Sequence, residues 1–239
     1  MDGPGADDRQ DTANGPGTAN GPGTANGPGT ANGPRTAEQP STARRPNRNV
    51  ARGEATRGQL VAIATRMFAE RGYEDTSIEA VLREAGVSRG SLYHHFASKE
   101  ALFEAVAEEV ETSVGAQTMA AASGSAGPVE ALRAGFLAWI RLAGDPVVRR
   151  ILLIDGPSVL GWERWRAMEE RHALGLIRAV LQLIADEGKL RPESVATLGN
   201  ILLASVNEVA LLVARSDDRE AAMQSGADAI DELLRRLFG

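Results

Sequence analysis

The sequence predicts an all-α protein, with a small N-terminal helix-turn-helix head and a larger helical C-terminal body. From about residue 55 onward, apolar side chains recur every three or four positions, which is the spacing of amphipathic helices. Glycine, proline and capping residues separate these stretches, and none shows the strict alternation of a β-strand. We therefore expect a tail over 1–54, a head over 55–106 and a body over 107–239.

Residues 1–54 are predicted to form a disordered tail. The hexapeptide TANGPG occurs three times in succession, and a fourth copy ends in Arg35. Apart from Met1, no large apolar side chain occurs before Val50, so burial cannot offset the entropy lost on ordering. We interpret the repeat as a passive solubilising extension, with a specific role for it as the alternative.

The first, second and fourth helices after the tail have clear start or stop signals. Thr76, with Glu79 three residues later, has the pattern of a capping box for the second helix. Ser98 can cap the fourth helix, which buries Leu102, Phe103, Val106 and Val110. The first helix is expected from Ala55 to Gly72, with an inward stripe of Leu60, Ile63, Ala64, Met67 and Phe68.

A sharp turn precedes the third and shortest helix. Gly86 suits the left-handed position that ends a helix, and Ser88 can cap the next one, expected over 89–95. Leu92 and Phe96, four residues apart, face inward. Two helices joined by such a turn form a helix-turn-helix unit. The outer face of the third helix carries Arg89, Gly90, Ser91, Tyr93 and His94.

This outer face is suited to DNA. It offers hydrogen-bond donors, one cation, a phenol and little bulk near its start, which fits the major groove. Lys99 follows the cap of the fourth helix, where its charge and free backbone N–H groups can hold a phosphate. The arginine-rich stretch 44–57 is either a basic arm that reaches DNA or a solvated linker.

The charge distribution favours a localised DNA contact. The net charge is −6, but residues 35–58 carry six arginines against Glu38 and Glu54. Residues 105–239 carry fourteen basic against nineteen acidic side chains. A basic approach surface attached to an acidic body is what such a contact needs.

The run TSIEAVLREAGVSRGSLYHHFASKEALFEAV resembles the N-terminal domain of the TetR family of bacterial transcription regulators. The match covers about 55–106 and includes the AGVS turn, the LYHHF run and the SKEAL helix start. It implies a homodimer with one recognition helix per subunit, released from DNA when a small molecule enters the C-terminal domain. Carried over by position, it implies base or phosphate contacts for the outer face of the third helix and its cap Ser88. It implies DNA backbone contacts for Thr76, Ser77, His95 and Lys99.

The body is expected to contain five helical stretches. Proline or aspartate starts most of them and glycine ends several, which is the usual asymmetry of helix termini. The expected segments are 128–144, 147–154 closed by Gly156-Pro157, a region to Gly188 with a break near Gly161, 192–215, and a last helix capped by Asp217 or Asp218.

The few aromatic residues of the body mark a candidate effector cavity. Large apolar side chains with a few polar groups among them are typical of small-molecule sites. A simple core role for these aromatics is the alternative, and Asp155 is also a candidate turn former. The predicted ligand contacts are Phe136, Trp139, Asp155, Trp162, Trp165, Arg166, Met168, His172 and Asn207, with Glu208 as a further candidate.

The last two helices are predicted to pair with their copies in a dimeric four-helix bundle. Their apolar stripes exceed what one surface helix needs, and small residues allow close approach of the axes. The alternative is that these side chains pack within one subunit. The predicted interface consists of Leu203, Val206, Ala210, Val213, Ile230, Leu233, Leu234 and Leu237.

Several function classes lack support in the sequence. There is no cysteine, and we find no nucleophile motif, phosphate loop or zinc-binding motif, so we expect no enzyme, metal or cofactor. The acidic N-terminus is unlike a signal peptide, and the apolar stretch 198–214 is interrupted by Asn200, Asn207 and Glu208. We expect a cytoplasmic protein without a membrane partner.

We therefore expect a ligand-responsive repressor that binds a palindromic operator as a homodimer. Its partners would be double-stranded DNA, a second copy of itself and an apolar or aromatic small molecule. The alternative is a regulator or activator that binds DNA without a small-molecule effector.

Overall fold

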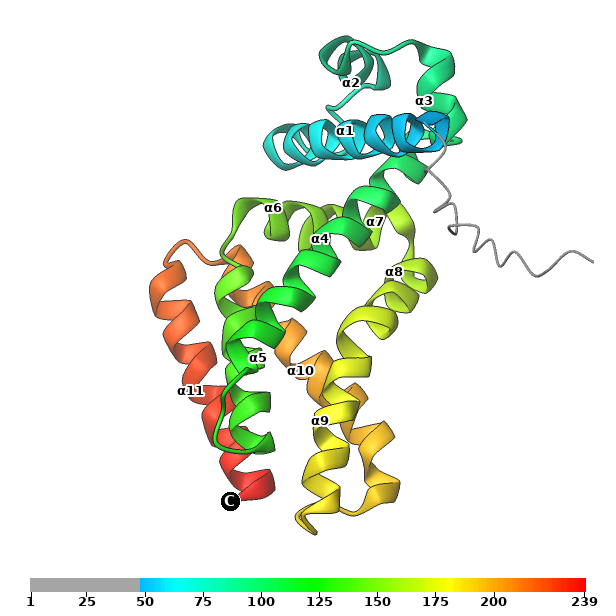
Figure 1. The fold of residues 1–239 in the computed structure, drawn as a ribbon. Coiled ribbons are helices and arrows are strands. Elements are labelled where there is room, and N and C mark those ends of the chain that lie inside the picture. Colours follow the sequence, from blue (N-terminus) through cyan, green and yellow to red (C-terminus); the bar gives the residue numbers. More distant parts are fainter. Residues whose placement is uncertain (1–47) are drawn as a thin grey trace, which may run out of the picture. The chain divides into compact units, whose positions relative to one another are not determined.

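The computed structural model describes residues 48–239, which belong to one compact unit, Pro46–Gly239 (Figure 1). These residues form helices and turns with no strand, so the all-α prediction is confirmed for the part of the chain that the structure describes. The TANGPG repeat and the arginines before residue 48 lie outside the described residues.

The head consists of α1 (Arg48–Arg71), α2 (Ile78–Ala85), α3 (Arg89–His95) and the start of α4 (Lys99–Ala122). The predicted inward stripes meet in one core. Phe68 and Phe103 pack edge to face with ring centroids 5.2 Å apart, and Leu92 is fully buried beside them in the same cluster. This core fixes α3 against α1 and leaves the opposite face of α3 exposed.

Helix α1 begins seven residues earlier than the predicted start at Ala55. Residues 48–54 contain no proline, and extending an existing helix adds one hydrogen bond for each residue fixed. The residues expected to end the tail are therefore helical. Of the predicted basic arm, the part from Arg48 to Arg57 lies in the first turns of α1.

The caps of α3 and α4 are as predicted. Ser88 accepts a hydrogen bond from the Ser91 amide at 3.2 Å, and Ser98 accepts one from Ala101 at 3.0 Å. Gly86 ends α2 at φ 66°, the left-handed conformation that glycine adopts without strain.

The predicted cap of α2 is wrong by one residue. Ser77, and not Thr76, accepts the capping hydrogen bond, from the Ala80 amide at 3.1 Å. The Thr76 hydroxyl is buried and lies 2.8 Å from the Gly72 carbonyl oxygen. It binds the end of α1, because the turn between the two helices directs it inward.

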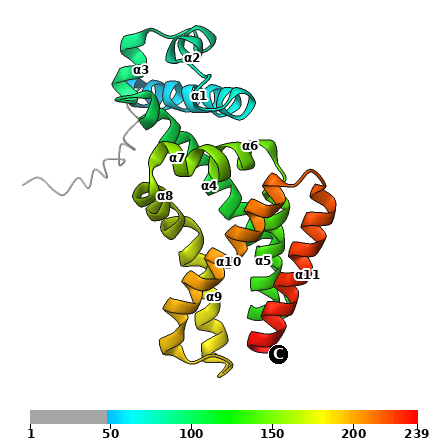
Figure 2. The ribbon, with the colours of Figure 1, turned by 180° about the vertical axis from the view of Figure 1, so that it is seen from behind.

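Helix α4 runs from the head into the body, and the predicted boundary at residue 106 falls inside it (Figure 1). It packs against α5 (Pro128–Leu142). Three short segments follow: α6 (Pro146–Val148), the π-helical turn η1 (Arg149–Asp155) and α7 (Gly156–Leu160). The remaining elements are α8 (Trp162–Glu169), the π-helical turn η2 (Glu170–Leu174), α9 (Gly175–Asp186), η3 (Pro192–Ser194), α10 (Val195–Arg215) and α11 (Arg219–Phe238) (Figure 2).

The predicted stop at Gly156-Pro157 does not end a helix. Gly156 and Pro157 follow the π-helical turn η1 without a break, and the chain remains helical to Leu160. The break comes at Gly161, with φ 76°, as expected. Asp218 caps α11 by accepting from the Ala221 amide, also as expected.

The predicted dimer stripe is largely internal to one chain. Six of its members are at most 2% exposed, because α10 and α11 turn these faces toward α5, α9 and each other: Leu203, Val206, Ala210, Val213, Ile230 and Leu234. These six residues therefore follow the alternative given above, in which the side chains pack within one subunit. Leu237 is 40% exposed, and Leu233 is partly buried.

The segment Pro192–Arg215 is long and apolar enough, by length and composition, to cross a membrane. In this structure one side of it packs into the body core, through residues such as Leu202 and Val206. It has the pattern of a core helix of a folded domain.

Candidate functional site

The outer face of α3 presents the predicted DNA-facing residues. Arg89, Gly90, Tyr93 and His94 are exposed, as is the cap Ser88, and Ser91 is partly exposed. Ser77 at the start of α2 is exposed on the neighbouring helix. The fold therefore brings these residues together on the helix-turn-helix unit.

Arg89 is held in place within the head. Its guanidinium donates a hydrogen bond to the Glu79 carboxylate at 2.9 Å, and both side chains are more than 60% exposed. The guanidinium carbon also lies 5.8 Å from the centre of the Tyr93 ring. An exposed pair of this kind is weak and can be exchanged for a DNA contact.

The residues expected to hold the DNA backbone differ in their availability. Lys99 is partly exposed; its ammonium lies 4.1 Å from the centre of the Tyr73 ring and donates to the Glu74 carbonyl at 3.3 Å. His95 is also partly exposed. Thr76 is 1% exposed, so its side chain cannot reach a phosphate in this conformation, and that prediction is corrected.

A buried carboxylate joins the head to the body. Asp155 in η1 accepts a hydrogen bond from the Tyr73 amide at 2.8 Å and another from the Arg150 Nε at 3.1 Å. Gly72 has φ 84°, and a side chain there would collide with the Arg150 guanidinium. Asp155 thus connects the α1–α2 turn with η1, and it does not line the cavity described next.

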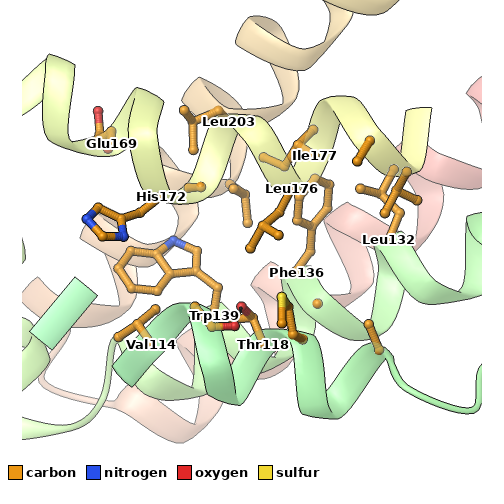
Figure 3. Close-up of a pocket in the computed structure, with 18 of the residues that line it drawn as sticks. Val114, Thr118, Leu132, Phe136, Trp139, Glu169, His172, Leu176, Ile177 and Leu203 are labelled. Atoms are coloured by element: carbon orange, nitrogen blue, oxygen red, sulfur yellow. Dashed lines mark hydrogen bonds between the residues drawn. The ribbon is translucent and has the colours of Figure 1, made fainter. Parts of the chain in front are cut away.

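The body contains a cavity of about 320 Å³ lined by α4, α5, the last residue of α8, η2, α9 and α10. Most of its lining is apolar, with Leu132, Phe136 and Ile177 toward one end (Figure 3). Glu169, His172 and the Trp139 indole gather at the other end. The size is at the lower limit of pockets that hold small organic molecules.

Four of the predicted ligand contacts line this cavity: Phe136, Trp139, His172 and Asn207. The indole of Trp139 donates to the Asn207 side-chain oxygen at 3.1 Å, and the Asn207 amide in turn donates to Glu169. The polar residue in α10 therefore has internal partners. Glu208, its neighbour, points outward and is exposed.

The other predicted contacts lie elsewhere. Trp162 is 66% exposed, and Trp165 donates to the Leu152 carbonyl at 3.3 Å. Arg166 donates to Asn200 at 2.9 Å, and Met168 is buried in the core shared with the head. These four side chains do not line the cavity, because α8 turns its tryptophans and Met168 away from it.

Two cavity residues that the sequence analysis missed are acidic. Glu111 and Glu169 are 7% and 5% exposed. Helical spacing could have indicated the burial of Glu111. It lies four residues after Ala107 and three before Val114, so it occupies an inward position of α4. Glu169 had no such signal, because it lies at the junction of α8 and the π-helical turn η2.

Burial controls the ionisation of both groups. It raises the pKa of Glu111 to about 8, and the nearby Glu169 and Glu108 carboxylates add to the effect. Burial also raises the pKa of Glu169 to about 7, although Arg166 and Asn207 act in the opposite direction. Close to neutral pH this end of the cavity thus holds two carboxyl groups that are at least partly protonated.

The pKa of Glu108, on the same helix as Glu111, is lowered and not raised. His172 contacts it through Nε2 at 2.6 Å, and Arg171 donates to its other oxygen. Burial alone would raise the pKa of Glu108, but these two hydrogen bonds outweigh it and lower the pKa. The pairing ties η2 to α4 beside the cavity.

Within residues 48–239, no three His, Asp or Glu side chains are arranged to hold a metal ion. His94 and His95 are neighbours, with ring centroids 5.2 Å apart, on the head.

Two family models match the chain. The model described as bacterial regulatory proteins of the tetR family covers 60–106, and a tetracyclin repressor-like C-terminal domain covers 129–237. The transcriptional repressor KstR2 of Mycobacterium tuberculosis is 38% identical over 82 residues, which are 34% of this chain. The A-factor receptor protein of Streptomyces griseus is 42% identical over 64 residues, 27% of this chain. These matches span only 41% and 23% of the two relatives.

Solved structures match over most of their length. A TetR-family transcriptional regulator from Pectobacterium atrosepticum is 30% identical, with a TM-score of 0.69, and the match covers 79% of this chain and 96% of that one. The regulator RolR, solved with its ligand resorcinol, has a TM-score of 0.62 at 20% identity, covering 80% of this chain and 96% of that one. The similarity to RolR shows a shared fold.

Proposed function

Because the chain belongs to the TetR family of bacterial transcription regulators, we propose that it binds a palindromic operator as a homodimer and is released by a small molecule. The protein acts in the cytoplasm as a repressor, with α3 in the major groove. The effector occupies the cavity between α4, α5, α9 and α10. The observation that carries this proposal is the placement of α4, which belongs to both the head and the cavity wall.

The head supports DNA binding through two kinds of contact. Arg89 and its neighbours on α3 are positioned to meet base edges, and Ser77, His95 and Lys99 surround them to hold phosphates. Thr76 contributes by fixing the α1–α2 turn. Since one head reads half of a site, two heads about one helical turn of DNA apart are needed.

Helix α4 supports ligand-dependent release. Its first turn carries Lys99, and its later turns carry Glu111, Val114 and Thr118, which line the cavity. A ligand that pushes these residues outward therefore also tilts the head. The Asp155 contacts with Tyr73 and Arg150 transmit movements of η1 to the same turn.

A homodimer is supported by an exposed apolar strip on α10. Ile201 and Leu212 are 54% and 60% exposed and lie three turns apart on one side of the helix, with the small Ala204 between them. Large exposed apolar side chains that share a face mark interaction surfaces. The interface proposed here is this outer face, adjacent to the stripe first predicted.

The proposal is tested in two stages. DNA fragments selected by the purified protein are first used in retardation assays at two salt concentrations, where steep salt dependence is expected. A compound library is then screened for release of the selected fragment. A regulator without an effector would bind DNA and ignore every compound.

A cavity-filling variant locates the effector. Leu176→Trp on α9 should keep DNA binding but lose release by the active compound, because the new indole occupies the cavity. Leu183→Trp, on the same helix but 56% exposed, is the control and should behave like the natural protein. Release that survives in Leu176→Trp would show that the effector binds elsewhere.

A further inference from the structure

The polar end of the cavity supplies too few hydrogen-bond donors for its two carboxyl groups. Glu169 Oε1 accepts from the Asn207 amide, but Glu169 Oε2 is fully buried with no hydrogen-bond partner among the described residues. Its nearest cation, Arg166, is 3.9 Å away, beyond hydrogen-bond distance, and donates to Asn200 instead. A buried unpaired acceptor of this kind is costly to the fold.

Glu111 is in a similar position on the opposite wall. It is 7% exposed, its pKa is raised by burial and by the negative charges of Glu169 and Glu108, and no hydrogen-bond donor lowers that pKa. The neighbouring Arg171 and His172 side chains are already engaged, since both bind Glu108. Both carboxyls therefore face the cavity without a compensating charge.

From this geometry we infer that the effector is an amphiphilic amine, whose ammonium group lies between Glu111 and Glu169 and whose apolar body extends along Phe136, Leu132 and Ile177. The inference rests on the proposed function, since it assigns a chemical class to the same cavity. A protonated amine supplies two or three N–H donors and a positive charge in one small group. A carboxylate ligand would place a further acidic group beside these two, and an alcohol supplies a single O–H donor.

The amine class also predicts a direction for pH dependence. A cation binds best when the two carboxyls are ionised, so binding displaces their protons. Alkylamines stay protonated to about pH 10, as lysine does. Affinity should therefore rise between pH 6 and pH 8.5, the range in which Glu169 and Glu111 ionise. The other charged groups around them, Arg166, Glu170, Glu108, Arg171 and His172, are paired with one another.

Three probes of equal chain length, octylamine, octanol and octanoate, test the inference on the full chain. Binding is measured by calorimetry, and release is measured on the selected DNA fragment. Octylamine should bind at least about tenfold more tightly than octanol, because charge-assisted hydrogen bonds are roughly twice as strong as neutral ones. Octanoate should bind weakest, and octylamine affinity should rise severalfold from pH 6 to pH 8.5.

Matched variants assign the effect to the two carboxyls. Glu169→Gln and Glu111→Gln should each lose most of the preference for octylamine over octanol while keeping octanol binding. Glu170→Gln, which removes the same charge from an exposed neighbour, should keep the preference. Circular dichroism confirms that each variant is folded.

The outcomes separate this inference from the proposed function. If octanol or octanoate releases DNA and octylamine does not, the cavity is an effector site but the amine class is wrong. If octylamine affinity falls with rising pH, or the two variants match Glu170→Gln, the carboxyl pair does not recognise the ligand. If no probe binds, the amine class is rejected here, and the compound screen decides the proposed function separately.

Discussion

Arg89 is the side chain of α3 that we expect to read DNA, and its present contacts are weak. Its guanidinium lies beside Glu79 and Tyr93 on the outer face of α3. The exposed ion pair with Glu79 contributes little to stability and is exchangeable. Arg89 can therefore turn from Glu79 to a guanine edge at small cost.

Replacing Arg89 by alanine should weaken operator binding by about 1–3 kcal/mol and relax the preference at one base position, if it reads guanine. Lys99→Ala, which removes a phosphate contact, should weaken all sequences alike and flatten the salt dependence. Retardation assays on a panel of single-base operator variants measure both effects. Natural affinity and selectivity in Arg89→Ala would rule out base reading by this residue.

The raised pKa values of Glu111 and Glu169 predict that the folded state loses stability as pH rises. The folded protein holds these protons up to about pH 7 and 8, whereas the unfolded chain releases them near pH 4.5. The unfolded state thus binds fewer protons in this window, so the free energy of unfolding falls from pH 5 to pH 8.

The variant Glu111→Gln should be as stable as the natural protein at pH 5 and more stable at pH 8, because it cannot ionise. One pKa unit corresponds to about 1.4 kcal/mol, so a gain of at least about 1 kcal/mol is expected after structural relaxation. Urea unfolding at both pH values measures it. Glu109→Gln, exposed on the same helix, is the control. Equal stability differences at both pH values would mean that Glu111 is not held protonated.

At the scale of the elements, one π-helical turn of the body contacts the head and the other lines the cavity. Such turns are rare, and they occur frequently at functional sites. The turn η1 carries Asp155, which binds the head through Tyr73. The turn η2 carries His172, which lines the cavity and binds Glu108 of α4. Both irregular segments thus contact elements that belong to the head.

Asp155→Ala should weaken the link between η1 and the head. It leaves the Tyr73 amide and Arg150 without their acceptor, so we expect a loss of about 1–3 kcal/mol in the free energy of unfolding. We also expect less DNA release at saturating effector, because the body moves the head less directly. Unfolding and release assays on one preparation measure the two effects.

Asp228→Ala is the matched control for this variant. Asp228 also accepts a hydrogen bond, from Gln224 at 2.9 Å, but it is exposed and the bond lies within α11. Full effector response in a folded Asp155→Ala protein would exclude the proposed role of this contact.

At the scale of the whole molecule, the exposed face of α10 is expected to form the dimer. Ile201→Glu or Leu212→Glu should give a folded monomer that has lost operator affinity, because a charge would be buried unpaired between the subunits. Leu234→Glu is the contrasting variant, since Leu234 is 2% exposed within one chain and the change should reduce helical content.

Sedimentation and circular dichroism together separate these cases. Loss of the partner without loss of helicity is expected for the α10 variants. An intact dimer in both of them, with natural operator affinity, would place the interface on another surface.

The sequence by itself determined the head and the course of most helices. The caps Ser88 and Ser98, the left-handed Gly86 and the inward stripe of α4 depend on residues three or four positions apart, and such interactions are local. The same locality explains the small error at Thr76. Two adjacent hydroxyl residues both have the chemistry of a cap, and packing of the α1–α2 turn selects Ser77.

The tertiary structure decided the cavity and the outward face of the last helices. Glu111 and Glu169 come from elements far apart in the chain, so their meeting depends on how α4 and α8 pack. An apolar stripe also looks the same whether it meets its own chain or a second copy. Whether Leu203 and Ile230 or Ile201 and Leu212 remain exposed depends on the rotation of each helix against α5 and α9. That rotation is set by side-chain packing between distant segments, which local periodicity does not encode.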